Sequence, residues 1–238
     1  MKKNYQLLNN IHHKDLKIIT ERSQEYGDNM PYAQVFPSEF RHLEAYYPII
    51  FRKNAETAQF EIVALFGFTE KENIFLKADM WKGCYIPLAL ARDPFLIGFQ
   101  NTSDGEKNPV VHINIDSPRV SRTDGENVFL PHGGNSPYLE YINSILMNIY
   151  EGIEESKNFI GTLLEFDLLE SFVFNAELKD GSKYKMTGFY TINEENLAKL
   201  NGDALAKLHV KGHLQLIYLA IASLSNIGKL MKIKNDLS

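Results

Sequence analysis

Apolar residues recur at helical spacing through the middle of the chain. From residue 138 to residue 169 they lie three and four positions apart, as along one face of a helix. Ser136 is the expected N-cap of this helix, and Pro137 is its expected first residue. The pattern predicts one long helix, or two helices joined near Gly161.

Alternating patterns on both sides of this segment predict strands. In "NPVVHINIDSP" (108–118), one face carries Val111, Ile113 and Ile115, and the other carries His112, Asn114 and Asp116. This is typical of a half-buried strand. "QFEIVALFGFT" (59–69) predicts another strand, with Gly67 at a bend or at a close backbone approach.

The clearest element is "SFVFNAELKDGSKYKMTGFYTIN" (171–193). Its two alternating runs flank residues 179–182, and Asp180-Gly181 predicts a hairpin with a type I′ turn. The side chains expected to face inward are Phe172, Phe174, Ala176 and Leu178.

Shorter helices are predicted near both ends of the chain. Ser38 is the expected N-cap of a short helix whose buried face holds Phe40, Leu43 and Tyr47 and which Pro48 ends. Near the C-terminus, a helix over 194–200 and another from 203 to about 232 are expected. Asn193 caps the first, and Gly212 breaks the second.

Strands followed by a helix, a hairpin and more helices, without strict alternation, favour an α+β fold. We expect a mainly antiparallel sheet, a long central helix, a β-hairpin and C-terminal helices. One domain is predicted over residues 1–238, β-rich to about residue 130 and helix-rich, with the hairpin, from about residue 131.

Composition excludes several protein classes. With 238 residues, 44% hydrophobic and 23% charged, the chain has an ordinary globular composition, and its net charge of −5 disfavours nucleic acid as a main partner. The single cysteine, Cys84, rules out an internal disulfide and is expected to be a packed thiol. The apolar stretch 214–224 is shorter than the about 20 residues needed to span a bilayer, so no transmembrane segment is predicted and the cytoplasm is the expected location.

The loop "PHGGNS" before the long helix is a candidate ligand site. It contains His132, Gly133, Gly134, Asn135 and Ser136. The glycines permit close approach of a ligand to the backbone, and amides at a helix start can hold an anion. The alternative is a tight loop that only steers the chain into the helix. The spacing matches no nucleotide-binding pattern.

A second candidate is the polar face that holds His112 and Asp116. Together with His132 these residues could supply metal ligands or a general base. The alternative is an ordinary solvated face. The sequence contains no strong catalytic or cofactor signature, so no catalytic residue, metal or cofactor is assigned.

Several phrases resemble the bacterial SapC family over residues 7 to 230: "LLNNIHHKDLKI", "YPIIFRK", "ALFGF", "NIFL", "FLPHGGNSPYLE", "GFYTINEENLAKL" and "LAKLHVKGHLQLIYLAIASLSNIGKL". The resemblance implies an association with surface-array (S-layer) proteins and with genes for TonB-dependent receptors, tryptophan-halogenase-like proteins and cupin-like oxygenases. It implies no catalytic residues. A peptide-transport permease is also called SapC, but this chain does not resemble that protein.

Two functions follow as hypotheses. The first is a non-catalytic binding or accessory protein, with a protein or peptide partner, that acts beside halogenase-like, cupin-like or receptor and surface-protein systems. The second is a metal-assisted enzyme that acts on an anionic or peptide substrate held by the Gly133-Gly134 loop. A regulatory ligand sensor is a minor third alternative.

Overall fold

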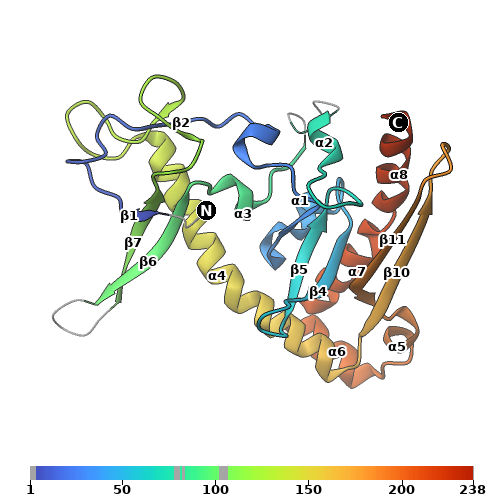
Figure 1. Ribbon diagram of the computed structural model, residues 1–238. Coiled ribbons are helices and arrows are strands. Elements are labelled where there is room, and N and C mark those ends of the chain that lie inside the picture. The colour runs from blue at the N-terminus through green and yellow to red at the C-terminus, as the bar shows by residue number, and fades with distance from the viewer. Residues whose placement is uncertain (1–3, 78–80, 82–83, 102–106, 238) are drawn as a thin grey trace. The chain divides into compact units, whose positions relative to one another are not determined.

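Antiparallel pairing joins every strand pair in the described residues, 4–77, 81, 84–101 and 107–237 of a computed structural model. Helices separate and follow the strands, which confirms the predicted α+β fold (Figure 1). The chain divides into two units. The first holds Met1–Asp28 and Leu88–Glu151, and the second holds Asn29–Pro87 and Gly152–Ser238. The prediction of one domain stays a prediction.

The first unit is built on a three-stranded sheet in the order β1 (Tyr5–Leu7), β7 (Lys107–Asn114), β6 (Phe95–Asn101). A smaller sheet follows the order β8 (Val120–Ser121), β2 (Lys17–Ile18), β9 (Glu126–Asn127). The short helices η1 (Gln24–Tyr26) and α3 (Leu88–Ala91) complete it, together with the first half of α4 (Pro137–Glu165).

The second unit contains a five-stranded sheet. Its order is β10 (Leu169–Glu177), β11 (Lys183–Ile192), β4 (Ile49–Lys53), β5 (Phe60–Leu65), β3 (Tyr32–Gln34). Its helices are η2 (Pro37–Glu39), α1 (Phe40–Leu43), α2 (Ile74–Lys77), the second half of α4, α5 (Glu194–Ala198), α6 (Gly202–Val210), α7 (His213–Ser223) and α8 (Asn226–Asp236).

The long helix begins as its sequence predicts and is continuous. The Ser136 hydroxyl oxygen accepts a hydrogen bond from the Leu139 N–H at 3.1 Å, which is the N-cap geometry, and Pro137 is the first helical residue. Gly161 lies inside α4, so the alternative of a single helix is the correct one.

Two glycines of α4 give a matched prediction. A Cβ at Gly161 would meet nothing within 4 Å, whereas a Cβ at Gly152 would lie 2.8–2.9 Å from three atoms of Phe36. We expect Gly161→Ala to raise the free energy of unfolding by about 0.5–1 kcal/mol, because alanine loses less backbone entropy in a helix.

At Gly152 the change to alanine should lower the free energy of unfolding by about 1 kcal/mol or more, because overpacking against Phe36 outweighs the helix preference of alanine. Urea denaturation of both variants measures the difference. Equal effects at Gly152 and Gly161 would contradict the packing against Phe36.

The hairpin is confirmed, but its predicted turn type is wrong. A type I′ turn needs positive φ at both central residues, and of Asp180 and Gly181 only Gly181 has it, at 84°. Leu178 donates to the Ser182 carbonyl at 2.9 Å, so the loop has three residues and Gly181 takes the left-handed position. The Asp180 carboxylate favours this longer loop by accepting the Ser182 N–H at 2.9 Å. Of the side chains predicted to face inward, Leu178 is buried and Phe172 and Phe174 are half-buried, while the Ala176 side chain lies outside the described part.

The first short helix keeps its predicted buried face but not its predicted cap. Phe40, Leu43 and Tyr47 are fully buried. The turn begins one residue before Ser38, with the Phe36 N–H donating to the Glu39 carboxylate at 2.9 Å. A buried carboxylate therefore holds the end that Ser38 was expected to cap.

At the C-terminus, Asn193 caps α5, and its side chain accepts the Asn196 N–H at 2.8 Å. The break at Gly212, with φ +73°, is also confirmed. A second break, between α7 and α8, was not predicted.

Within the described residues, one stretch, His213–Asp236, is long and apolar enough to cross a membrane if only length and composition are considered. Polar contacts tie it to the second unit: Ser223 accepts the Ile49 N–H at 2.8 Å, and Asn226 donates to the Glu44 carbonyl at 2.6 Å. Both Ser223 and Asn226 are fully buried. This single, weakly apolar stretch is no clear transmembrane segment.

Candidate functional site

Strand β11 changes its neighbours halfway along its length. Phe189 and Tyr190 pair with β4, but residues 183–186 pair with β10 alone within the described part of the chain. Between these halves the register with β10 shifts, so that two residues, Thr187 and Gly188, oppose one. This is a β-bulge, and the φ of +82° at Gly188 fits the bend that a bulge introduces.

Beside this bulge, one edge of the first half of β11 has no partner strand among the described residues. Leu178 donates to the Ser182 carbonyl, and hydrogen-bonded pairs alternate along an antiparallel ladder. The residues bonded to β10 are therefore Tyr184 and Met186. The N–H and C=O of Lys185 point away from β10, toward the unpaired edge.

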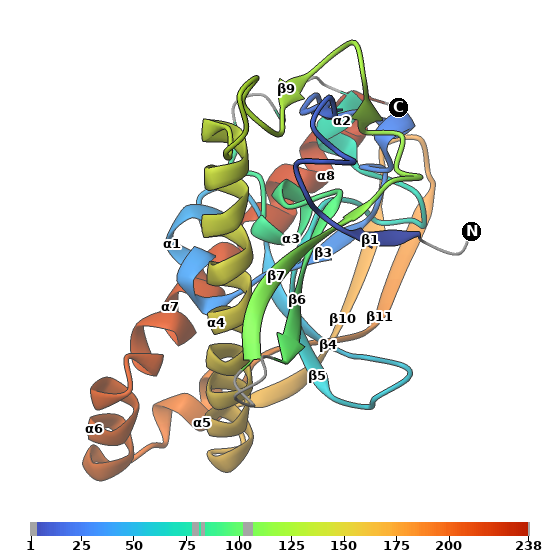
Figure 2. The same cartoon turned by 90° about the vertical axis from the view of Figure 1, so that its left-hand side faces the viewer.

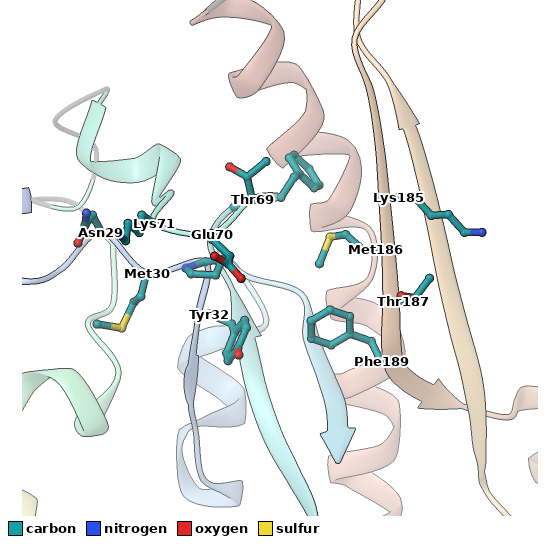
Figure 3. Close-up of a pocket in the computed structure, with 13 residues that line it drawn as sticks. Asn29, Met30, Tyr32, Thr69, Glu70, Lys71, Lys185, Met186, Thr187 and Phe189 are labelled. Atoms are coloured by element: carbon teal, nitrogen blue, oxygen red, sulfur yellow. The ribbon is translucent and has the colours of Figure 1, made fainter. Parts of the chain in front are cut away.

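A cavity of about 660 Å³ adjoins this edge. Because the bulge adds one residue, Met186 and Phe189 project from the same face of β11, as their partners Phe174 and Phe172 do from β10. Figure 3 shows Met186 and Phe189 directed toward the cavity, opposite Tyr32. The lining residues come from β11, from the entry to β3 and from the segment after β5; they are Asn29, Met30, Pro31, Tyr32, Gly67, Phe68, Thr69, Glu70, Lys71, Lys185, Met186, Thr187 and Phe189.

Aromatic contacts form the apolar side of this cavity. The Tyr32 and Phe189 rings meet edge to face with centroids 6.0 Å apart, and the Phe68 ring stacks on Phe174 at 5.8 Å. The Tyr32 hydroxyl accepts a hydrogen bond from the Arg52 guanidinium, which also lies over the Tyr32 ring. The Tyr32 ring is thus held in place at the cavity wall.

Backbone contacts fix the segments that carry Tyr32 and Phe68. The Pro31 carbonyl accepts the N–H groups of Phe66 and Gly67, at 2.6 and 3.1 Å. Gly67 lies so close to Glu72 that a Cβ there would be 2.6 Å from the Glu72 carbonyl oxygen, which confirms the predicted close approach. The Glu72 carboxylate accepts the Phe68 N–H at 3.1 Å.

Glu72 also forms an ion pair with Lys234 of α8. Burial lowers the pKa of Lys234, but the hydrogen bond to Glu72 and the negative charge of Glu72 outweigh it, so this pKa lies above its ordinary value. The ammonium group stays charged at neutral pH. The ion pair thus links the segment that follows β5 to α8.

The structure gives the predicted "PHGGNS" loop a local role. Gly133 and Gly134 have φ of +87° and +86°, as their sequence allows. The Gly133 N–H donates to the Leu130 carbonyl at 3.0 Å, and the Ser136 N–H donates to the Val128 carbonyl at 3.1 Å. These amides close the loop onto the preceding segment.

The polar side chains of this loop are exposed or form local hydrogen bonds. His132 and Asn135 are exposed, and the Asn135 amide group donates to Glu140 at 2.6 Å. The Ser136 hydroxyl donates to the Asn127 carbonyl at 2.5 Å. These contacts favour the alternative in which the loop steers the chain into α4, and ligand binding by residues 132–136 stays a prediction.

The "HINID" residues separate from one another. His112 is half-buried on β7, and its ring covers Gly98 of β6, where a Cβ would lie 2.6 Å from the His112 Cε1. The strand ends at Asn114, so Asp116 lies in the following turn and is exposed. Among the described residues, no three His, Cys, Asp or Glu side chains gather as metal ligands. The structure therefore does not assemble His112, Asp116 and His132 into a metal centre.

Cys84 is half-buried. Burial raises the pKa of its thiol, and a hydrogen bond with Tyr47 lowers it by less. A protonated thiol is a weak nucleophile, which agrees with the expected packed thiol.

Sequence reasoning did not find the cavity beside β11. One local signal was present: Gly188 interrupts an alternating strand pattern, and an isolated glycine there is typical of a bulge. The aromatic wall had no such signal, because Tyr32, Phe68 and Phe189 are distant in sequence and meet only through the sheet order.

Comparison with known proteins gives one match. The model of the SapC family, described as SapC, matches residues 8–230. No curated protein and no solved structure matches the chain.

Proposed function

This chain belongs to the SapC family, and we propose that it is a non-catalytic accessory protein that binds an extended peptide segment of a partner protein along the edge of β11. The observation that carries the proposal is the edge of residues 183–186, which has no partner strand among the described residues and lies beside a cavity with an aromatic and thioether side. An extended peptide can pair its backbone with such an edge and place alternate side chains in an adjoining pocket.

One side of the cavity is apolar and favours large apolar side chains on the bound segment, while the rest of the lining is polar or charged. Met30, Tyr32, Phe68, Met186 and Phe189 supply aromatic and thioether surface. Methionine suits a binding surface because its flexible side chain adapts to different partners. The peptide's backbone would supply affinity at the edge, and one or two apolar side chains would supply selectivity in the cavity.

The family resemblance indicates the setting. We infer that the partner belongs to a halogenase-like, cupin-like or receptor and surface-protein system, and that binding takes place in the cytoplasm. The bound segment would be flexible when free, because an extended peptide pairs with a sheet edge only if it is not already in a sheet of its own.

The sharpest test changes one backbone donor. We expect Lys185→Pro to weaken peptide binding by about tenfold, because proline removes the N–H that points to the unpaired edge. Proline is tolerated at such an edge position, so the hairpin should still form. The probes are linear peptides selected from a random displayed library on the wild-type protein, and their Kd values are measured by fluorescence anisotropy.

Lys185→Ala is the matched control, since it removes the side chain and keeps the N–H. It should bind the selected peptides as the wild type does. Met30→Asp, which places a charge in the cavity, should weaken the same peptides without changing the fold. Peptides that bind Lys185→Pro and Met30→Asp as tightly as the wild type would overturn the proposed site.

A further inference from the structure

One face of the first unit's sheet lies against α4 and becomes more exposed along its length. Residues 95, 97 and 99 of β6 share one face, and residues 113, 111 and 109 of β7 are their cross-strand partners. At the start of this face Phe95 is fully buried, with its ring 6.3 Å from that of Tyr138 on α4. At its far end Phe99 is 42% exposed and contacts Tyr150, which is 47% exposed. Figure 2 shows β6 and β7 beside α4 along this face.

A slot of about 280 Å³ lies between these two ring contacts, lined by residues of β6, β7 and α4. Its walls are apolar except at one side chain, and no charged residue of the described part of the chain lines it. The lining residues are Ile97, Pro109, Val110, Val111, Asn143, Leu146 and Met147. An apolar slot without charge selects an uncharged, mostly apolar molecule.

Asn143 is the exception. Its side-chain carbonyl oxygen is buried and has no hydrogen-bond partner in the described part of the protein. A buried carbonyl oxygen without a donor is destabilising, and buried amide groups are nearly always paired. Asn143 lines the slot, and the terminal torsion of an asparagine side chain is soft, so rotation about it can present this oxygen to the slot. What the slot lacks is one hydrogen-bond donor.

We propose that this slot binds a small, uncharged, mostly apolar molecule that carries a single hydroxyl or N–H donor. The apolar body lies between Ile97 and Val111 of the sheet and Leu146 and Met147 of α4, and the donor bonds to the Asn143 side-chain oxygen. The binding is non-covalent. It is independent of the peptide site, because every lining residue belongs to the first unit and the β11 cavity belongs to the second.

The test uses two probes of nearly equal shape, naphthol and methylnaphthalene. Only naphthol can donate a hydrogen bond. Calorimetric titration of the full chain measures the Kd of each probe for the wild type, for Asn143→Leu and for Met147→Trp. Leucine keeps the volume of asparagine and removes its polar atoms, while tryptophan at the half-exposed Met147 fills the slot from the helix surface.

We expect both probes to bind the wild type, naphthol more tightly. Asn143→Leu should weaken naphthol by about five- to tenfold and leave methylnaphthalene unchanged or tighter. Met147→Trp should abolish the binding of both, and thermal melting should show that both variants are folded. If neither probe binds the wild type, or if Met147→Trp binds both as before, the slot is not the site. If Asn143→Leu weakens both probes equally, the assigned donor contact is wrong.

Discussion

Replacing Arg119 by methionine is expected to lower the free energy of unfolding of the first unit by about 3–5 kcal/mol. Arg119 is 1% exposed, and its guanidinium lies 2.5 Å from the Asp28 carboxylate. It also donates to the carbonyls of Ile19 and Glu21, at 3.0 and 2.8 Å. Methionine fills much of the same volume but removes a buried donor from both carbonyls and the Arg119 charge from Asp28, whose Oδ2 still accepts the Ser23 N–H at 3.0 Å; this loss is the main cost.

In Arg119→Met, the segment around Asp28 should open before the whole unit unfolds. Arg22 still contacts Asp28 at 3.1 Å, so the carboxylate keeps one cationic partner and the expected cost lies toward the lower end of the range. Urea denaturation gives the free energy, and hydrogen exchange should show the earliest loss of protection in residues 15–28, which Arg119 joins to the rest of the unit.

Arg122→Met is the matched control. Arg122 is exposed, so the same chemical change there should alter the free energy of unfolding by less than about 0.5 kcal/mol. The double variant Arg119→Met, Asp28→Asn should cost less than the sum of its single changes, because the two side chains form one buried pair. Equal effects at Arg119 and Arg122 would contradict the buried role of Arg119.

The elements that the sequence predicts well are those specified by neighbouring residues. The Ser136 side chain caps α4 by accepting the N–H three residues later, and Pro137 is the first helical residue. Asn193 caps α5 in the same way. Gly212 breaks the C-terminal helix by its own backbone conformation. Asp180-Gly181, by contrast, predicts a type I′ turn. The hydrogen bond from the Ser182 N–H to the Asp180 carboxylate favours the three-residue loop instead.

Interactions between distant residues explain most of what could not be predicted. Arg119 and Asp28 are 91 positions apart, and no periodicity joins them. The edge of β11 is a functional candidate only because β4 pairs with residues 189 and 190 and not with the rest of the strand. A pattern can indicate that residues 183–192 form a strand, but the number of its neighbours depends on the whole sheet.

The predicted ligand loop illustrates the same limit at short range. Gly133-Gly134 and a helix start are the right ingredients for an anion site. Whether the amides are available depends on where the preceding residues lie, and here the carbonyls of Val128 and Leu130 accept two of them. The β11 hairpin differs from this loop. Its bulge at Gly188 is a local feature, and the neighbouring edge of residues 183–186 has no partner strand among the described residues.

Replacing Phe159 by alanine is the second change with a large expected effect. It should lower the free energy of unfolding of the second unit by about 3–5 kcal/mol. Phe159 lies on α4 and is fully buried. Its ring meets Phe40 of α1 at 5.9 Å, Phe51 of β4 at 6.2 Å and His213 of α7 at 5.3 Å. One side chain thus joins three elements to α4. The cavity left by alanine cannot close, because each of the three neighbours is held by its own backbone element.

The fluorescence of Trp81 reports this loss directly. It is the single tryptophan of the chain, it is 3% exposed and it belongs to the second unit. Leu164→Ala, at a 53% exposed position of the same helix, should cost less than about 1 kcal/mol, and Phe159→Leu should recover a large part of the loss. If Phe159→Ala costs no more than Leu164→Ala in urea titrations followed at Trp81, α4 does not hold the α1, β4 and α7 packing together. If it costs the expected amount, the β11 edge and its cavity rest on a core in which Phe159 is the central contact.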